Sequence, residues 1–198
     1  MEKQVFNPFT RLDDYVPDGE PHVFGDRVYI YGSHDKENGD RFCMLDYVTY
    51  SAPVDNLKDW RCDGVIYKAS QDPLYPKYRA MYAPDVVKGN DGRYYLYYSM
   101  ADSHGCSNIF SVAVCDTPDG EFQFHGYVRN QDGSLMQKFG IFDPGLINDD
   151  GVIRLYYGVW HNWYEDPKFT VEDCIFNQMR ILGKTREQVL QEQNEEGG

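Results

Sequence analysis

The stretch that decides the fold is residues 16–33, which reads VPDGEPHVFGDRVYIYGS. It places acidic residues at the start of a short apolar strand, continues through a turn at Gly25-Asp26, and enters a second strand rich in Tyr, Val and Ile. A Gly-Asp pair between two such runs is a strong signal for a β-hairpin. We therefore expect an antiparallel hairpin that begins beside Asp18.

The same pattern occurs twice more along the chain. Residues 83–99 (APDVVKGNDGRYYLYYS) and residues 143–158 (DPGLINDDGVIRLYYG) again join an acidic strand start to a turn and a Tyr-rich strand. The copies are spaced by roughly 60 residues, a period typical of propeller blades made of several short strands. We predict an all-β fold, with a partial β-propeller of about three blades over residues 1–169 and a helical or irregular tail over 170–198.

Alternation of apolar and polar residues, bounded by turn residues, predicts the individual strands. After Trp160 the alternation stops, and helices are expected over 172–181 and 186–193, the second with Thr185 as a possible N-cap. The expected strands of the three blades are 20–24, 27–33, 42–51 and 64–68, then 84–88, 93–100, 107–115 and 122–128, then 144–148 and 152–159.

Composition limits the possible partners. The formal net charge of −13 argues against nucleic acids and anionic membranes, whereas a neutral sugar would feel no repulsion. The five cysteines form no CxxC pair, which predicts no metal site and fits reduced, mostly buried thiols of a cytoplasmic protein. Residues 1–4 open no apolar run of signal-peptide length, and no later segment is suited to span a bilayer. No cofactor is expected.

Acidic residues at equivalent strand starts predict a shared cavity. Propeller blades radiate from one axis, so the first strands of successive blades should bring Asp18, Asp85 and Asp143 together. Neighbouring carboxylates push their pKa values apart, which separates an acid from a base. Inverting glycoside hydrolysis needs such a pair, roughly 6.5–9.5 Å apart, with room for water. The alternative is that an Asp beside a Pro is simply part of a turn.

These motifs resemble glycoside hydrolase family 43, whose members are five-bladed β-propellers acting on arabinose- and xylose-containing glycans. The resemblance implies that Asp18 is the general base and that Asp143 tunes and orients the acid. Gly19 stands where the family usually has Pro, so Glu20 in Glu20-Pro21 is a rival for the base. The resemblance rests on Asn7-Pro8, the spacing from Asp18 to Gly25-Asp26, Tyr82-Ala83-Pro84-Asp85 and Phe142-Asp143-Pro144.

One part of the family pattern is missing. The resemblance covers about residues 5–160, and the family's general acid, a Glu opening a fourth blade, has no counterpart. Glu165, Glu172 and Glu187 lie in loop or helical contexts and are not assigned that role. Two interpretations follow: an inverting hydrolase, or a truncated, non-catalytic module that binds glycan or assembles with a second copy or a complementary chain.

Other residues are candidates for binding the sugar. His22 should point the same way along its strand as Glu20, and Tyr82 takes the place of a family Trp. The alternative for each is ordinary packing between blades, and Asp85 fits a structural or pocket-lining role better than a catalytic one. The candidate substrate-binding residues are Glu20, His22, Arg79, Tyr82, Asp85 and Trp160.

Overall fold

The structure is a computed structural model that describes residues 9–101, 107–137, 140–159, 185–188 and 191. The chain divides into two compact units, Met1–Trp160 and His161–Gly198. The predicted helix over 172–181 and the candidate residue Trp160 lie outside the described residues. Each unit is considered by itself.

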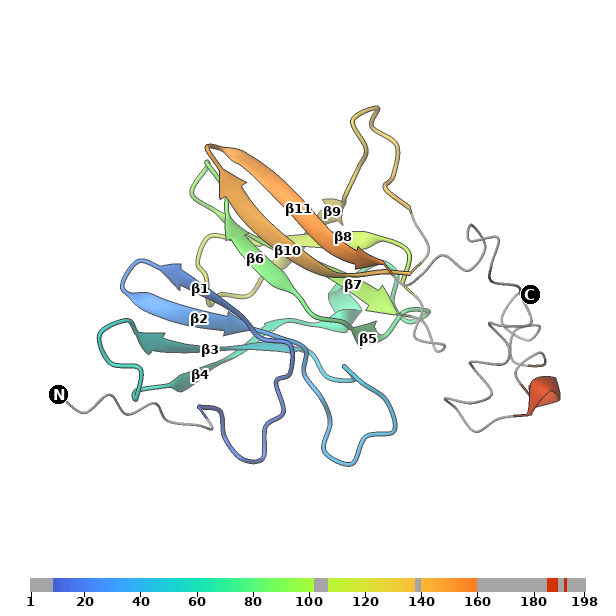
Figure 1. Cartoon of the computed structure of the whole chain (residues 1–198), viewed down its shortest axis with the longest axis horizontal. Helices are drawn as coiled ribbons and strands as arrows, with labels where there is room; N and C mark the ends of the chain where they lie inside the picture. The colour runs from blue at the N-terminus through green and yellow to red at the C-terminus, as the bar shows by residue number, and fades with distance from the viewer. Residues whose placement is uncertain (1–8, 102–106, 138–139, 160–184, 189–190, 192–198) are drawn as a thin grey trace. The chain divides into compact units, whose positions relative to one another are not determined.

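The first blade is a four-stranded antiparallel sheet in sequential order (Figure 1). The turn at Gly25, whose φ is +65°, joins the first two strands as predicted. The register pairs Glu20 with Tyr31 and Phe24 with Arg27. The strands are β1 (Glu20–Phe24), β2 (Arg27–Tyr31), β3 (Tyr47–Pro53) and β4 (Arg61–Tyr67).

The second blade follows a short 3₁₀ helix, η1 (Ala69–Gln71), and has the same meander. Its first strand is interrupted, because two short segments pair one after the other with the same strand. These segments are β5 (Ala80–Met81) and β6 (Asp85–Lys88), and the strands that follow are β7 (Tyr94–Ala101), β8 (Phe110–Cys115) and β9 (Gln123–Tyr127).

The third blade comprises two strands in the described part of the chain, β10 (Ile141–Asp149) and β11 (Val152–Val159). Strand β10 lies beside β6 and β7 of the second blade (Figure 1). Asn148 Nδ2 donates to the Lys88 carbonyl at 2.9 Å, and Asn90 Nδ2 donates to the Gly151 carbonyl at 2.9 Å. The turns of the second and third blades are therefore joined.

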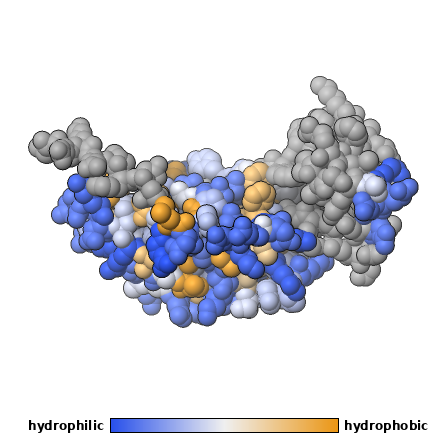
Figure 2. Space-filling model, turned by 90° about the horizontal axis from the view of Figure 1, so that it is seen from below, coloured by the Kyte–Doolittle hydropathy of each residue, from blue (hydrophilic) through white to orange (hydrophobic). Residues whose placement is uncertain are grey.

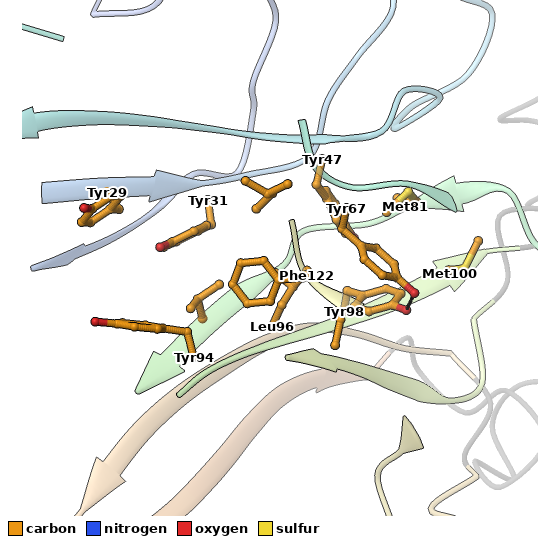
Figure 3. Packing of buried hydrophobic residues seen from close by; sticks show 13 residues of the cluster. Tyr29, Tyr31, Tyr47, Tyr67, Met81, Tyr94, Leu96, Tyr98, Met100 and Phe122 are labelled. Carbon is orange, nitrogen blue, oxygen red and sulfur yellow. Dashed lines mark hydrogen bonds between the residues drawn. The ribbon is translucent and has the colours of Figure 1, made fainter. Parts of the chain in front are cut away.

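The core lies between the first two blades and is built mainly from aromatic rings (Figure 3). Tyr98 packs against Tyr67 at 5.0 Å between ring centroids and against Tyr47 at 5.8 Å. Buried tyrosine needs a partner for its hydroxyl, and Tyr98 is hydrogen-bonded to Tyr67 at 2.8 Å and to the buried Asp72 carboxylate at 2.6 Å. Burial raises the pKa of Tyr98 strongly, so the hydroxyl stays protonated.

The β-propeller architecture predicted from the repeats is confirmed. Every expected strand is present, and β1 and β11 have the expected ends. The start of β3 was predicted wrongly at residue 42, because Cys43 has a φ of +56° and the chain extends only from Tyr47. The two-residue strand β5 was not predicted, because two residues are too few to show an alternation of apolar and polar side chains.

The second unit has one described feature, a helical turn at residues 186–188. Thr185 caps it as expected, since its Oγ1 accepts from the Gln188 N–H at 3.3 Å while Gln188 Oε1 accepts from the Thr185 N–H at 2.8 Å. This reciprocal pair is a capping box. Among the described residues no helix is long and apolar enough to cross a membrane.

Candidate active site

Asp18 sits at the open end of the first hairpin. Glu20 pairs with Tyr31, so the same register continued by two residues places Asp18 opposite Ser33. Ser33 is fully buried and its Oγ donates to Asp18 Oδ2 at 3.5 Å. Asp18 has a φ of +56°, a left-handed conformation that an L residue rarely adopts and that costs free energy. Such a residue is held in place by its surroundings.

The segment before Asp18 is anchored to the first blade. Both ring nitrogens of His34 face acceptors: Nε2 lies 2.7 Å from Asp14 Oδ1, and Nδ1 lies 2.8 Å from the Asp46 carbonyl. The Tyr50 hydroxyl donates to the second oxygen of Asp14. A bridge between Tyr15 and Asp35 completes the attachment. The backbone that carries Asp18 is therefore fixed from both sides.

Asp143 lies in a β-bulge of the third blade. Phe142 pairs with Gly158 and Gly145 with Tyr156, so Asp143 and Pro144 together oppose one residue of β11. Asp143 has a φ of +49°, the left-handed conformation usually taken by glycine at the first position of such a bulge. A bulge re-aims the side chains of its strand. Asp143 is exposed as a residue, although its carboxylate is partly removed from water.

The charge of Asp18 acts on Asp143 across the blades. Partial removal from water, followed by the negative charges of Asp18 and Glu20, raises the pKa of Asp143 above the ordinary value for an aspartic acid. Asp18 belongs to the first blade and Asp143 to the third, yet their carboxylates lie within electrostatic range. Glu20 lies in the same cluster but contributes less than Asp18, and it is exposed at the start of β1.

A thiol that was not predicted as a site residue lies beside this cluster. Cys43 is 5% exposed, and the charges of Asp18 and Asp143 both act on it. Burial is the main cause that raises its pKa to about 11, so the group is a neutral thiol at pH 7. The hairpin register points to Ser33 from the sequence alone. No local pattern indicates Cys43, because a loop over residues 32–46 brings it there.

His22 and Asp85 are in contact between the first and second blades. His22 Nε2 lies 2.5 Å from Asp85 Oδ1, and the imidazole ring stacks on Phe24 with 5.6 Å between ring centroids. Asp85 is 2% exposed and also accepts hydrogen bonds from the backbone N–H groups of Val86 and Leu146. Asp85 is thus occupied by protein groups, and His22 remains partly accessible.

Arg79 and Tyr82 lie on the segment around β5. The Arg79 side chain folds back on its own loop, where Nε donates to the Pro76 carbonyl at 2.9 Å and the guanidinium lies 5.8 Å from the centre of the Tyr75 ring. Tyr82 is half-buried and its carbonyl accepts from the Tyr47 hydroxyl. The sugar-binding roles expected for both remain predictions.

Among the residues that the structure describes, no group of three or more His, Cys, Asp or Glu side chains is arranged to hold a metal ion. The three cysteines in this part of the chain are free: Cys43 is buried, Cys115 half-buried and Cys62 exposed. The arrangement at the blade openings is a set of carboxylates from separate blades. Paired carboxylates of this kind suit acid–base chemistry on an uncharged substrate.

Repeated antiparallel blades place the chain among the β-propeller proteins. The chain belongs to glycosyl hydrolase family 43, whose model matches residues 13–195. The family resemblance seen in the motifs is therefore confirmed.

Curated relatives support this membership. The chain is 50% identical over 163 residues to a xylosidase/arabinosidase of Thermoclostridium stercorarium, an alignment that covers 80% of this chain and 34% of the relative. It is 34% identical to xylosidase/arabinosidase 43A of Humicola insolens, covering 73% of this chain and 43% of the relative. The chain thus spans between a third and a half of the length of these relatives.

Solved structures give the same result. A family 43 enzyme of Xanthomonas citri, crystallised with xylose, superposes with a TM-score of 0.61 and 29% identity, covering 77% of this chain and 43% of that one. A β-xylosidase/α-arabinofuranosidase from a compost metagenome, crystallised with xylotriose, superposes with a TM-score of 0.58 and 30% identity over 77% of this chain and 44% of that one.

Proposed function

We propose that this chain contains the general base of an inverting glycoside hydrolase site that acts on xylose- or arabinose-containing glycans. Asp18 is the general base that activates water, and Asp143 tunes and orients the general acid. The observation that carries this proposal is the pair of acids at the openings of the first and third blades: Asp18 and Asp143 both have left-handed backbones, and the charge of Asp18 helps to raise the pKa of Asp143. Curated relatives named xylosidase/arabinosidase support the substrate class.

The choice of Asp18 over Glu20 as the general base rests on the backbone conformation and the contacts of Asp18. Asp18 has the left-handed backbone that often marks functional residues, and Ser33 holds its carboxylate from a buried position. Glu20 begins a regular strand and is exposed. The strained residue is therefore the better candidate for a fixed base.

The test is hydrolysis of p-nitrophenyl β-xyloside and α-arabinofuranoside by the full chain. Asp18→Asn should lower the rate by about 10²–10⁴-fold, because loss of a general base has that effect. Asp26→Asn, at the opposite end of the hairpin, is the matched control and should leave the rate unchanged. The first sugar product should have the inverted anomeric configuration by NMR. Undiminished activity of Asp18→Asn would reject the assignment.

A second candidate function is a glycan-binding or assembly module. It is favoured by the third blade, where Ile147, Val152 and Tyr156 are 49%, 56% and 60% exposed. An apolar sheet face of this kind suits a second copy or a complementary chain that would supply the general acid. The mass in solution and the binding of xylotriose by calorimetry separate the two. Hydrolysis by a monomeric chain would contradict the second function; binding without hydrolysis would favour it.

A further inference from the structure

Asp85 connects the inner strands of all three blades. It is the first residue of β6, and its Oδ1 lies 2.5 Å from His22 Nε2 in β1 and 2.6 Å from its own neighbour, the Val86 nitrogen. Its Oδ2 accepts from the Leu146 N–H in β10 at 2.6 Å. One buried carboxylate thus receives contacts from the first, second and third blades.

The two ends of this connection lie close in sequence to the proposed catalytic acids. His22 follows Asp18 by four residues within the first hairpin, and Leu146 follows Asp143 by three residues within β10. Asp18 and Asp143 both have left-handed backbones, which persist only where neighbouring contacts hold them. The contacts of Asp85 act on both segments at once.

We propose that Asp85 and His22 form a positioning pair that sets the separation between the carboxylates of Asp18 and Asp143. Asp85 acts through the backbone of β10 and through the ring of His22, not by contact with the sugar. The catalytic meaning of this pair rests on the roles proposed for Asp18 and Asp143. The contacts of Asp85 with the three blades do not depend on those roles.

The chemistry of the carboxylate explains why an amide would not replace it. Both oxygens of Asp85 are used: the Val86 and Leu146 N–H groups donate to them, and the His22 nitrogen lies 2.5 Å from Oδ1. In Asp85→Asn one oxygen becomes an NH₂ group, which would face an N–H donor. The substitution also removes the negative charge of the carboxylate, so the contacts of this side chain with β1 and β10 are weakened.

The test measures the electrostatic coupling between the two acids by a mutant cycle, using carboxyl NMR titration of the full chain. Asp18→Asn removes a negative charge, so it should lower the pKa of Asp143 in the wild-type background. The same substitution is then made in the Asp85→Asn background. We expect the coupling to fall to about half or less, because Coulomb energy falls with distance and with entry of water.

The cycle separates positioning from simple removal of charge. Loss of the Asp85 charge alone would shift the pKa of Asp143 equally with and without Asp18, and would leave the coupling unchanged. Asp72→Asn is the matched control, since Asp72 is also 2% exposed and hydrogen-bonded to Tyr98 and to the Leu74 N–H. It should lower stability in urea without changing the coupling.

Either of two results would overturn the proposal: equal coupling in the wild-type and Asp85→Asn backgrounds, or the same reduction in Asp72→Asn. If Asp85→Asn does not fold, the same coupling between Asp18 and Asp143 is measured in the His22→Phe background. That variant removes the nitrogen but keeps a ring to stack on Phe24, and reduced coupling supports the proposal whereas unchanged coupling refutes it. The titration needs no hydrolysis, so failure of this proposal can be distinguished from failure of the proposed activity.

Discussion

The second and third blades contain the same tripeptide but give it different surroundings. Leu96-Tyr97-Tyr98 lies in β7, where Leu96 and Tyr98 are 0% exposed. Leu155-Tyr156-Tyr157 lies in β11, where Leu155 is half-buried and the two tyrosines are 60% and 37% exposed. Strand β7 has partners on both sides, whereas β11 pairs with β10 alone in the part of the chain described. The same local sequence therefore lies in a hairpin in both blades but is not equally buried.

One face of the molecule is mostly hydrophilic, with separate hydrophobic patches between polar side chains (Figure 2). The acidic composition accounts for the polar majority. Large apolar side chains remain exposed on β10 and β11, namely Ile147, Val152, Tyr156 and Tyr157.

The largest expected effect compares the two leucines. Leu96→Ala should lower the free energy of unfolding by about 2–5 kcal/mol, because it removes a fully buried side chain and leaves a cavity. Leu155→Ala should cost less than half as much, since Leu155 is only half-buried. Urea unfolding of both variants measures the difference. Equal losses would mean that a further element covers β11.

The second effect compares the two tyrosine hydroxyls. Tyr98→Phe should cost about 1.5–3 kcal/mol, because the buried Asp72 carboxylate loses a hydrogen bond. Tyr157 packs on Phe110 through its ring at 5.6 Å between centroids, which Tyr157→Phe preserves. That variant should stay within about 0.5 kcal/mol of the wild type in thermal or urea unfolding. A large loss there would reveal a partner for the Tyr157 hydroxyl.

The third effect compares the two halves of the candidate site. A Cβ at Gly32 would lie 2.6 Å from the Pro17 carbonyl oxygen, directly before Asp18. Gly32→Ala should therefore displace that segment and cost about 1–3 kcal/mol. A Cβ at Gly145, two residues after Asp143, would meet nothing within 4 Å. Gly145→Ala should be nearly neutral in the same unfolding assay, and a comparable loss in both would show that the third blade is packed as tightly as the first.

The sequence alone determined the hairpins and their order. Turn residues such as Gly25 and Gly151 have the positive φ that their positions require, and alternation along the strands placed β1, β2 and β11 close to their observed bounds. These features depend on neighbours a few residues apart, so they can be read from the chain. The pairing of Asp18 with Ser33 belongs to the same class, since the hairpin register extends to it.

Only the tertiary structure decided which acids act together. Asp18, Asp85 and Asp143 occupy similar places in their repeats, yet Asp85 is buried against His22 and Leu146 while Asp143 is exposed beside the charge of Asp18. The early start expected for β3 was wrong partly for the same reason: the loop containing Cys43 is held by Asp35 within the loop and by Met81 of β5 in the second blade. Burial and charge proximity are sums over distant neighbours, and no local pattern contains them.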